Sequence, residues 1–156
     1  MLGADISDPD GTECGGSVRG LGLLPGCQTV FRSGKTQTRT KGTFGEVRGF
    51  FSCLSHAHFY GYEVHMGVTE SACDSLTDRG GCFCNNIAGC YVHGIFDSAD
   101  VSGALIRALY HAKGLQYQGA VTDRCTHRSQ QLDLLADTVR KNLDIARIYR
   151  IMEDGV

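Results

Sequence analysis

The 156-residue sequence lacks several features that would place it in a specialised class of protein. Its formal net charge is -2, from 15 basic and 17 acidic side chains, so no positive excess favours nucleic acid. No apolar run reaches the length that spans a membrane. Residues 1–13 contain neither a basic nor an apolar segment, unlike a secretory signal. We therefore expect a cytoplasmic protein without nucleic-acid or membrane partners.

The chain also lacks the Gly-x-x-x-x-Gly-Lys-Ser/Thr loop, which excludes nucleotide binding of the P-loop kind. It has only 2 prolines but 21 glycines, a composition that indicates many tight turns. Apolar residues make up 42% and charged residues 21%, as in ordinary globular proteins, so disorder is not indicated. A chain of this length is expected to form one domain with a buried core.

Eight cysteines are present, but in a reducing cytosol they need not pair. Most are expected to be buried as small apolar side chains. Cys82, Cys84, Cys90 and His93 lie close together in the sequence, yet their spacing lacks the paired C-x-x-C units of structural zinc sites. A small metal-binding protein is therefore a distant alternative, and we assign no metal ligands.

The order of the elements, strands first and helices afterwards, predicts an α/β fold. Alternating or short apolar runs predict strands at residues 29–32, 35–40, 47–54, 62–66 and 90–93. The polar segment 35–40 is expected to be an exposed edge strand. The polar, glycine-rich residues 69–86 are expected to form a surface excursion.

Apolar residues at helical spacing predict a helix from Val101 to Ala112, with Asp97 or Ser98 as its N-cap and Gly114 as its stop. Two further apolar stripes, over residues 132–143 and 145–152, predict a helical tail that turns near residues 142–144.

His93 ends a short apolar run and precedes Gly94 and a helix start. Open α/β sheets place ligands and catalytic side chains at such strand ends. His93 there would act as a general base for a thiol or hydroxyl nucleophile, or, in a structural role, hydrogen-bond a loop carbonyl. Glu63 and His65 share one face of the predicted strand, which makes them candidates for lining a cleft.

Four ordered segments resemble the cobyric acid synthase family, the glutamine-dependent amidases of cobalamin biosynthesis. Residues 20–36 are similar to its GLGLLP...T.F...KT pattern and residues 61–69 to GYEIHMG.T. Residues 91–97 are similar to Y.HG.FD and residues 132–149 to LAD.VR..LD...IY. The first three are shared more loosely with cobyrinic acid a,c-diamide synthase, an alternative assignment. The tail favours cobyric acid synthase, and the similarity covers nearly the whole chain.

The resemblance implies a partial class I glutamine amidotransferase domain, of the flavodoxin-like kind, over residues 1–114. It implies that residues 115–156 form a linker and a helical tail packed on that domain. A cysteine would attack glutamine with His93 as general base, and the released ammonia would amidate peripheral carboxylates of a corrinoid, adenosylcobyrinic acid a,c-diamide, to give cobyric acid. ATP and Mg²⁺ are implied only for a separate synthetase domain, and no cofactor is implied for this chain.

The sequence departs from the wider class at the position two residues after the histidine. Other class I amidotransferases carry a glutamate there, whereas this chain has Ile95. The resemblance therefore implies a Cys–His dyad. Asp97, Glu63 or a backbone carbonyl would orient His93.

A second departure concerns the nucleophile. Residues 1–3 match the end of the family's nucleophile elbow, so the cysteine is expected before Met1 and the isolated chain is expected to be inactive. Cys14 follows a turn, not a strand, and Cys90 points to the face of its strand opposite His93. Neither fits the role. The alternative is a catalytically inactive module that binds or regulates a separate synthetase chain.

Overall fold

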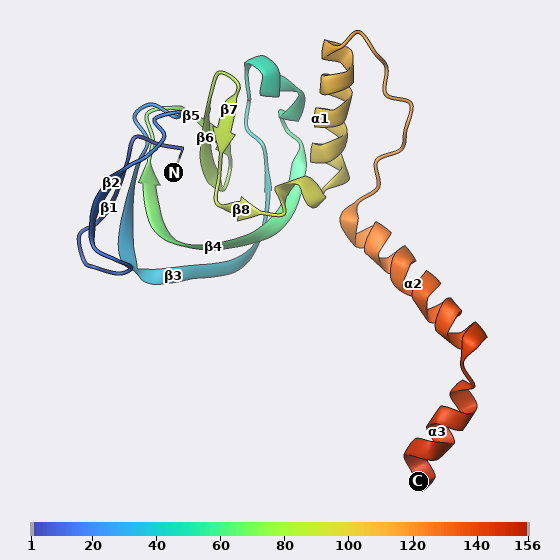
Figure 1. Cartoon of the computed structure of the whole chain (residues 1–156). Coiled ribbons are helices and arrows are strands. Elements are labelled where there is room, and N and C mark those ends of the chain that lie inside the picture. The colour runs from blue at the N-terminus through green and yellow to red at the C-terminus, as the bar shows by residue number, and fades with distance from the viewer. Residues whose placement is uncertain (1, 156) are drawn as a thin grey trace. The chain divides into compact units, whose positions relative to one another are not determined.

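A computed structural model describes residues 2–155 and divides the chain into two compact units, Met1–Val121 and Thr122–Val156 (Figure 1). We describe each unit by itself. Met1, on which part of the match to the nucleophile elbow depends, lies outside the described residues. The predicted domain boundary at residue 114 and the predicted packing of the tail stay predictions.

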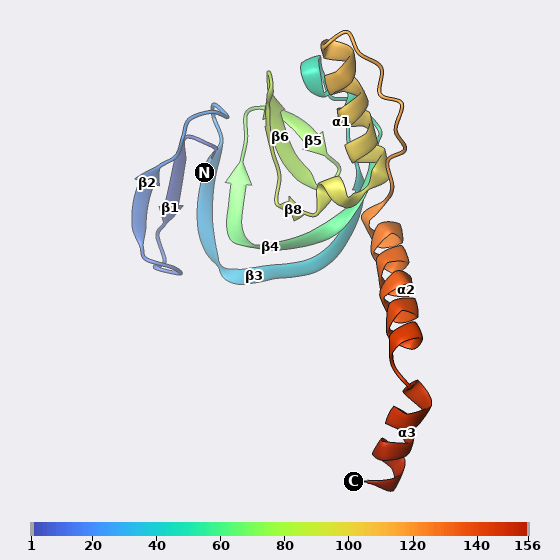
Figure 2. The ribbon, with the colours of Figure 1, turned by 45° about the vertical axis from the view of Figure 1, so that its right-hand side comes forward.

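The larger sheet of the first unit has the order β2-β1-β3-β4-β8 in the described part of the chain. Parallel pairing joins β1 and β3, and the other pairs are antiparallel. Two long curved strands, β3 and β4, run side by side through its middle (Figures 1 and 2). The five strands are β1 (Asp5–Asp8), β2 (Gly16–Arg19), β3 (Gln28–Thr43), β4 (His58–Glu70) and β8 (Val92–His93).

A smaller antiparallel sheet has the order β5-β6-β7, formed by β5 (Asp74–Thr77), β6 (Gly80–Cys84) and β7 (Ile87–Gly89). It corrects the prediction of a polar surface excursion over residues 69–86. The glycine-rich composition concealed a hairpin, because Gly80 and Gly81 adopt φ of 87° and 81° where β6 begins. The side chains of Leu76 and Phe83 are buried in the core.

The predicted strand over residues 47–54 is wrong, because Gly49–Leu54 form a 3-10 helix, η1. Gly49 has φ of 65°, a left-handed conformation that interrupts an extended strand. Short apolar runs are compatible with either a strand or a helix, so the sequence pattern alone did not separate them.

The predicted strands at 29–32 and 35–40 are parts of the single strand β3. A β-bulge between Phe31 and Thr36 interrupts its register with β4. On the other side of β3, β1 covers only Gln28–Val30. Residues 35–40 therefore form an edge of the sheet, as predicted, and most of their side chains are exposed.

The predicted first helix is confirmed as α1 (Ala99–Ala112), with Ser98 at its N-cap position. The Ser98 hydroxyl donates to the His58 carbonyl at 2.7 Å, which joins the helix start to β4. Val101 is completely buried. Gly114, with φ of 69°, follows the helix end as the sequence predicted.

Two clusters of apolar side chains form the core of the first unit. The larger cluster includes Phe44 and Phe59, whose rings pack edge to face at 5.6 Å. The smaller cluster centres on Leu24, Cys27 and Cys82, between the two sheets. Together with the helices, these sheets confirm the predicted α/β fold class.

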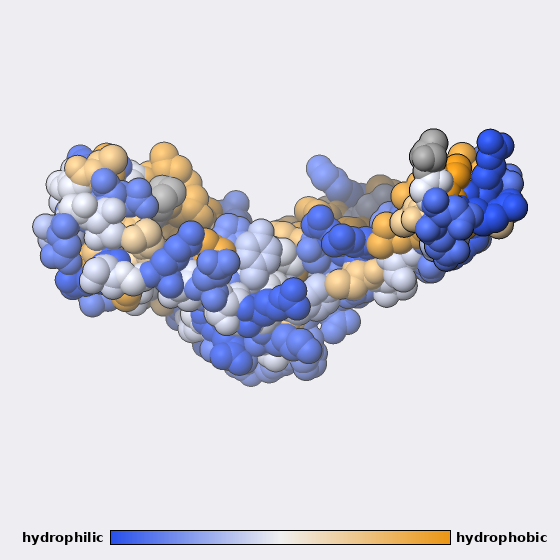
Figure 3. Space-filling model, turned by 90° about the horizontal axis from the view of Figure 1, so that it is seen from below, coloured by the Kyte–Doolittle hydropathy of each residue, from blue (hydrophilic) through white to orange (hydrophobic). Residues whose placement is uncertain are grey.

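The second unit contains α2 (Arg124–Asn142) and α3 (Ile145–Asp154), which confirms the helical tail. Asp123 caps α2 by accepting from Cys125 N, and Asp144 caps α3 by accepting from Arg147 N. Apolar side chains lie beside charged ones on this unit (Figure 3). No helix within residues 2–155 combines the length and the apolar character needed to cross a bilayer.

Candidate active site

His93 is the last residue of β8, a strand of only two residues that pairs with β4. Gly94 follows with φ of 77°, which turns the chain into the 3-10 helix η2 (Ile95–Asp97) and then into α1. Ile95 is buried in the larger core and holds this turn in place. His93 is left exposed at the strand end.

Gly61 on β4 allows β8 to approach closely. A Cβ atom at this position would collide with the carbonyl oxygen of His93 and would lie 2.8 Å from Val92 Cγ1. Any side chain here would therefore push β8 away from β4. Gly61, the first glycine of the GYEVHMG segment, thus determines where His93 lies.

The ring of Tyr62 stacks on the ring of His93, with centroids 5.0 Å apart and planes 9° from parallel. The two residues are direct partners across β4 and β8. Within residues 2–155, the His93 ring nitrogens make no hydrogen bond, so this stack is the contact that fixes the ring plane. Sequence reasoning missed Tyr62, because only the strand register reveals the pairing.

Glu63 and His65 lie together, as their spacing predicted. The Glu63 carboxylate is 3.3 Å from Nε2 of His65, and Nδ1 of His65 is 2.9 Å from the Gly67 carbonyl oxygen. The side chains of Glu63 and His65 are largely buried, with 14% and 19% of their surface exposed. Both nitrogens of the His65 ring thus face oxygen acceptors.

The structure does not bring this pair to His93. Successive residues of a strand point to opposite faces, so Tyr62, with the His93 ring, and Glu63 lie on different sides of β4. The Glu63 carboxylate is already occupied by His65. Of the three groups considered for orienting His93, Glu63 is therefore the least suitable.

Asp97 belongs to the turn that follows His93. Its backbone N–H donates to the Gly94 carbonyl at 2.8 Å, and its carbonyl accepts from the Tyr60 hydroxyl at 3.0 Å. Its carboxylate lies beside Gly94, within 3.1 Å of where a Cβ atom would stand. Asp97 thus supports the backbone next to the histidine.

One network joins three of the segments that resemble the amidotransferase family. The hydroxyl of Thr69 is hydrogen-bonded both to Thr29, at 2.7 Å, and to the hydroxyl of Tyr91. The Tyr91 ring in turn stacks on His65, with centroids 4.1 Å apart. Segments that are far apart in the sequence are thereby fixed around β4, close to the start of β8.

No cysteine of the described chain occupies a nucleophile elbow, which requires a preceding strand and a following helix. Cys14 is exposed in the loop between β1 and β2. The Asp8 carboxylate orders that loop by accepting the backbone N–H groups of Thr12, Glu13 and Gly15. Burial raises the pKa of the Cys90 thiol, which disfavours the reactive thiolate.

Within residues 2–155, no three histidine, cysteine or acidic side chains are grouped in a way that would hold a metal ion. The alternative of a metal-binding protein that used the segment from Cys82 to His93 therefore gains no support.

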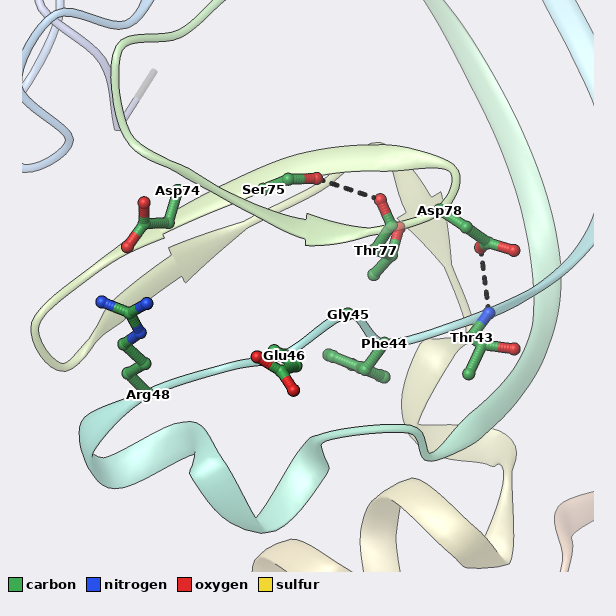
Figure 4. Close-up of a pocket in the computed structure, with 9 residues that line it drawn as sticks. All are labelled: Thr43, Phe44, Gly45, Glu46, Arg48, Asp74, Ser75, Thr77 and Asp78. Atoms are coloured by element: carbon green, nitrogen blue, oxygen red, sulfur yellow. Dashed lines mark hydrogen bonds between the residues drawn. The ribbon is translucent and has the colours of Figure 1, made fainter.

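A cavity of about 450 Å³ lies away from His93, between the segment that follows β3 and the β5–β6 hairpin (Figure 4). The side chain of Arg48 points towards Asp74 (Figure 4). Asp78 accepts the backbone N–H of Thr43 at 2.9 Å and closes one end. A neighbouring cavity of about 630 Å³ shares Arg48 and Asp74. None of the predicted site residues lines either cavity.

The α/β fold and the joined motif segments are those of a glutamine amidotransferase domain. Residues 1–101 match the CobB/CobQ-like glutamine amidotransferase domain, and the chain belongs to this family. The chain is 37% identical to the cobyric acid synthase of Ruminiclostridium cellulolyticum and 35% identical to that of Lachnoclostridium phytofermentans, with 100% of the chain covered in each case. The cobyric acid synthase of Photorhabdus laumondii is 37% identical over 98% of the chain.

These relatives confirm the resemblance seen in the sequence. The chain spans 33% of the length of the first and third relatives and 34% of the second, about one third of each.

Proposed function

We propose that this chain is the glutaminase part of a cobyric acid synthase and serves cobalamin biosynthesis. Ammonia released from glutamine would amidate peripheral carboxylates of adenosylcobyrinic acid a,c-diamide, giving cobyric acid. ATP and Mg²⁺ would act in a synthetase part that corresponds to the rest of the relatives' length. The observation that carries the proposal is the exposed ring of His93 at the end of β8, in a segment that resembles the family's Y.HG.FD pattern.

His93 would act as the general base in both halves of the glutaminase reaction. It would first take the proton of a cysteine thiol, and the thiolate would attack the carbon of the glutamine side-chain amide. The C–N bond would break, ammonia would leave with a proton returned from the imidazolium, and a thioester would remain. His93 would then activate the water that hydrolyses the thioester to glutamate.

Tyr62 would hold the His93 ring in the plane required for these proton transfers. The parallel stack also places the face of an aromatic ring against the imidazolium that forms when His93 takes a proton. Such cation–π contacts at exposed sites contribute about 0.5–1 kcal/mol. Tyr62 would thus be a positioning residue, whereas His93 would contact the reacting atoms.

The nucleophile is assigned to a cysteine that none of the eight in this sequence supplies. The support for this assignment is the absence of a strand–cysteine–helix turn among residues 2–155. We therefore expect the chain alone to release no ammonia from glutamine, and this can be measured as glutamate formation.

A chimera tests the proposal directly. The matching C-terminal third of the Ruminiclostridium cellulolyticum enzyme is replaced by this chain, and cobyric acid formation is measured with glutamine or with ammonium as nitrogen donor. We expect both donors to work. His93→Ala should lower the glutamine-dependent rate by about 10²–10⁴-fold, the contribution of a general base, and leave the ammonium-dependent rate intact.

His111→Ala is the matched control, because His111 is exposed near the end of α1, and it should leave both rates unchanged. A chimera that uses ammonium but not glutamine would contradict the glutaminase proposal and favour an inactive binding module.

A further inference from the structure

Two buried thiols from different sheets lie against each other in the smaller core cluster. Cys27 precedes β3 of the larger sheet, and Cys82 belongs to β6 of the smaller one. Their sulfur atoms are 3.3 Å apart, and the residues are only 2% and 5% exposed. They are separated by 55 positions in the sequence, so the fold alone brings them together.

Other polar groups hold the two thiols in this place. The Ser71 hydroxyl is 3.1 Å from the sulfur of Cys27. The neighbouring thiol of Cys73 donates to the Pro25 carbonyl, also at 3.1 Å, and is thereby directed to the backbone. A disulfide bond is about 2.05 Å long, so the sulfurs of Cys27 and Cys82 need to approach by little more than an ångström to form one.

We propose that Cys27 and Cys82 form a reversible modification site, at which a small disulfide such as oxidised glutathione converts the two thiols into a disulfide that joins the two sheets. The thiolate of one cysteine attacks the oxidant and releases one thiol. The second cysteine then attacks the mixed disulfide and releases another. The protein loses two electrons and two protons, and the oxidant is reduced to two thiols.

The burial of the pair makes the reaction slow at neutral pH. Loss of solvation on burial, together with the adjacent Cys27 thiol, raises the pKa of the Cys82 thiol to about 11. Because the thiolate is the attacking species, the rate of cross-linking should rise as the pH increases towards this value. The disulfide would therefore form during sustained exposure to an oxidant and not during a brief pulse.

Tryptic mapping identifies the link without any substitution of the pair. The exposed Cys14 and Cys125 are first changed to serine, which prevents links between chains. The folded protein is then incubated with oxidised glutathione, alkylated and digested without reductant. Trypsin separates the cysteines into peptides 20–32, 49–79 and 80–107. We expect peptides 20–32 and 80–107 to be joined, with the mass of two hydrogen atoms lost.

Two single substitutions identify the partner within peptide 80–107, which also holds Cys84 and Cys90. Cys82→Ala should abolish the link, and Cys84→Ala should retain it. No link after prolonged incubation, a link from peptide 20–32 to 49–79, or a link that survives in Cys82→Ala would each overturn the proposal. The outcome is independent of whether the chain acts in a glutaminase.

Discussion

Ile95 stands where other class I amidotransferases carry a glutamate, and its side chain is buried in the core beneath the turn that follows His93. That position therefore anchors the backbone and offers no carboxylate to the imidazole. The aromatic ring of Tyr62 is the group that contacts His93. The contacts that the structure shows at the His93 ring and backbone are therefore an aromatic stack and a strand pairing.

Substitution of Tyr62 tests this arrangement at the level of one residue. In the chimera, Tyr62→Leu should lower the glutamine-dependent kcat by roughly 2–10-fold, as expected from the loss of an aromatic pair that contributes about 0.5–1.5 kcal/mol. Tyr62→Phe preserves the ring and should preserve the rate. The ammonium-dependent rate should not change in either variant.

An NMR signature separates positioning from a general structural effect. In the isolated chain, the Hε1 resonance of His93 should be shielded by the Tyr62 ring, should stay shielded in Tyr62→Phe and should move downfield in Tyr62→Leu. An unchanged resonance in Tyr62→Leu would show that the stack is not formed in solution.

The sequence indicated His93, Glu63 and His65 as candidate site residues, because their residue types and spacing are visible in short segments. It did not indicate that the ring of His93 lies on the face of β4 opposite Glu63 and His65. That separation depends on the pairing of Tyr62 with His93 across 31 residues, and strand register over such a distance is not encoded in local periodicity.

At the level of elements, the position of β8 depends on the absence of a side chain in β4. A methyl group at Gly61 would collide with the backbone of β8, so the strand would have to move. Gly45 is the contrasting case. A Cβ atom added there would lie 3.8 Å from the nearest atom, which is an ordinary van der Waals contact. The two glycines form a matched pair for substitution.

Gly61→Ala should therefore remove the stacking signature of His93, abolish glutamine-dependent activity in the chimera and destabilise the first unit by about 1–3 kcal/mol, as overpacking does. Gly45→Ala should leave the signature and the activity unchanged. Urea unfolding followed by circular dichroism measures the stability of both variants. Equal behaviour of the two would contradict the assigned role of Gly61.

The helices were predictable because their apolar spacing and their caps agree. Ser98 and Gly114 mark a start and a stop of the first helix that the structure confirms. The β5–β6 hairpin was missed because its strands are short and contain polar residues such as Asp74 and Ser75. Its burial comes from packing against the larger core, through Leu76 and Phe83, which no local pattern reveals.

At the level of the whole molecule, the buried thiols make stability depend on alkaline pH. The pKa of Cys82 is raised from 9.0 to about 11 in the folded chain. The unfolded chain therefore loses this proton first as the pH rises, so stability is fully present below about pH 9 and is lost towards pH 11.

Under reducing conditions, the urea midpoint should fall between pH 9 and pH 11, because the folded protein must keep Cys82 protonated. In Cys82→Ala, the urea midpoint should fall less between pH 9 and pH 11 than in the unsubstituted protein. Each midpoint is compared with that of the same protein at pH 7, because the substitution also lowers stability there. A midpoint with the same pH dependence in both proteins would show that this thiol does not control the alkaline transition.

The hydrogen bond between Thr29 and Thr69 spans 40 positions, and that between Thr69 and Tyr91 spans 22. Contacts of such sequence separation form late, because the chain must first lose the entropy of closing long loops. During synthesis, β4 would leave the ribosome well before β8, and its residues Tyr62 and Glu63 would lack their strand partners until residues 92 and 93 arrive. The candidate base therefore reaches its place only when β8 pairs with β4, and a chain that stalls before residue 92 would leave this part of β4 unpaired.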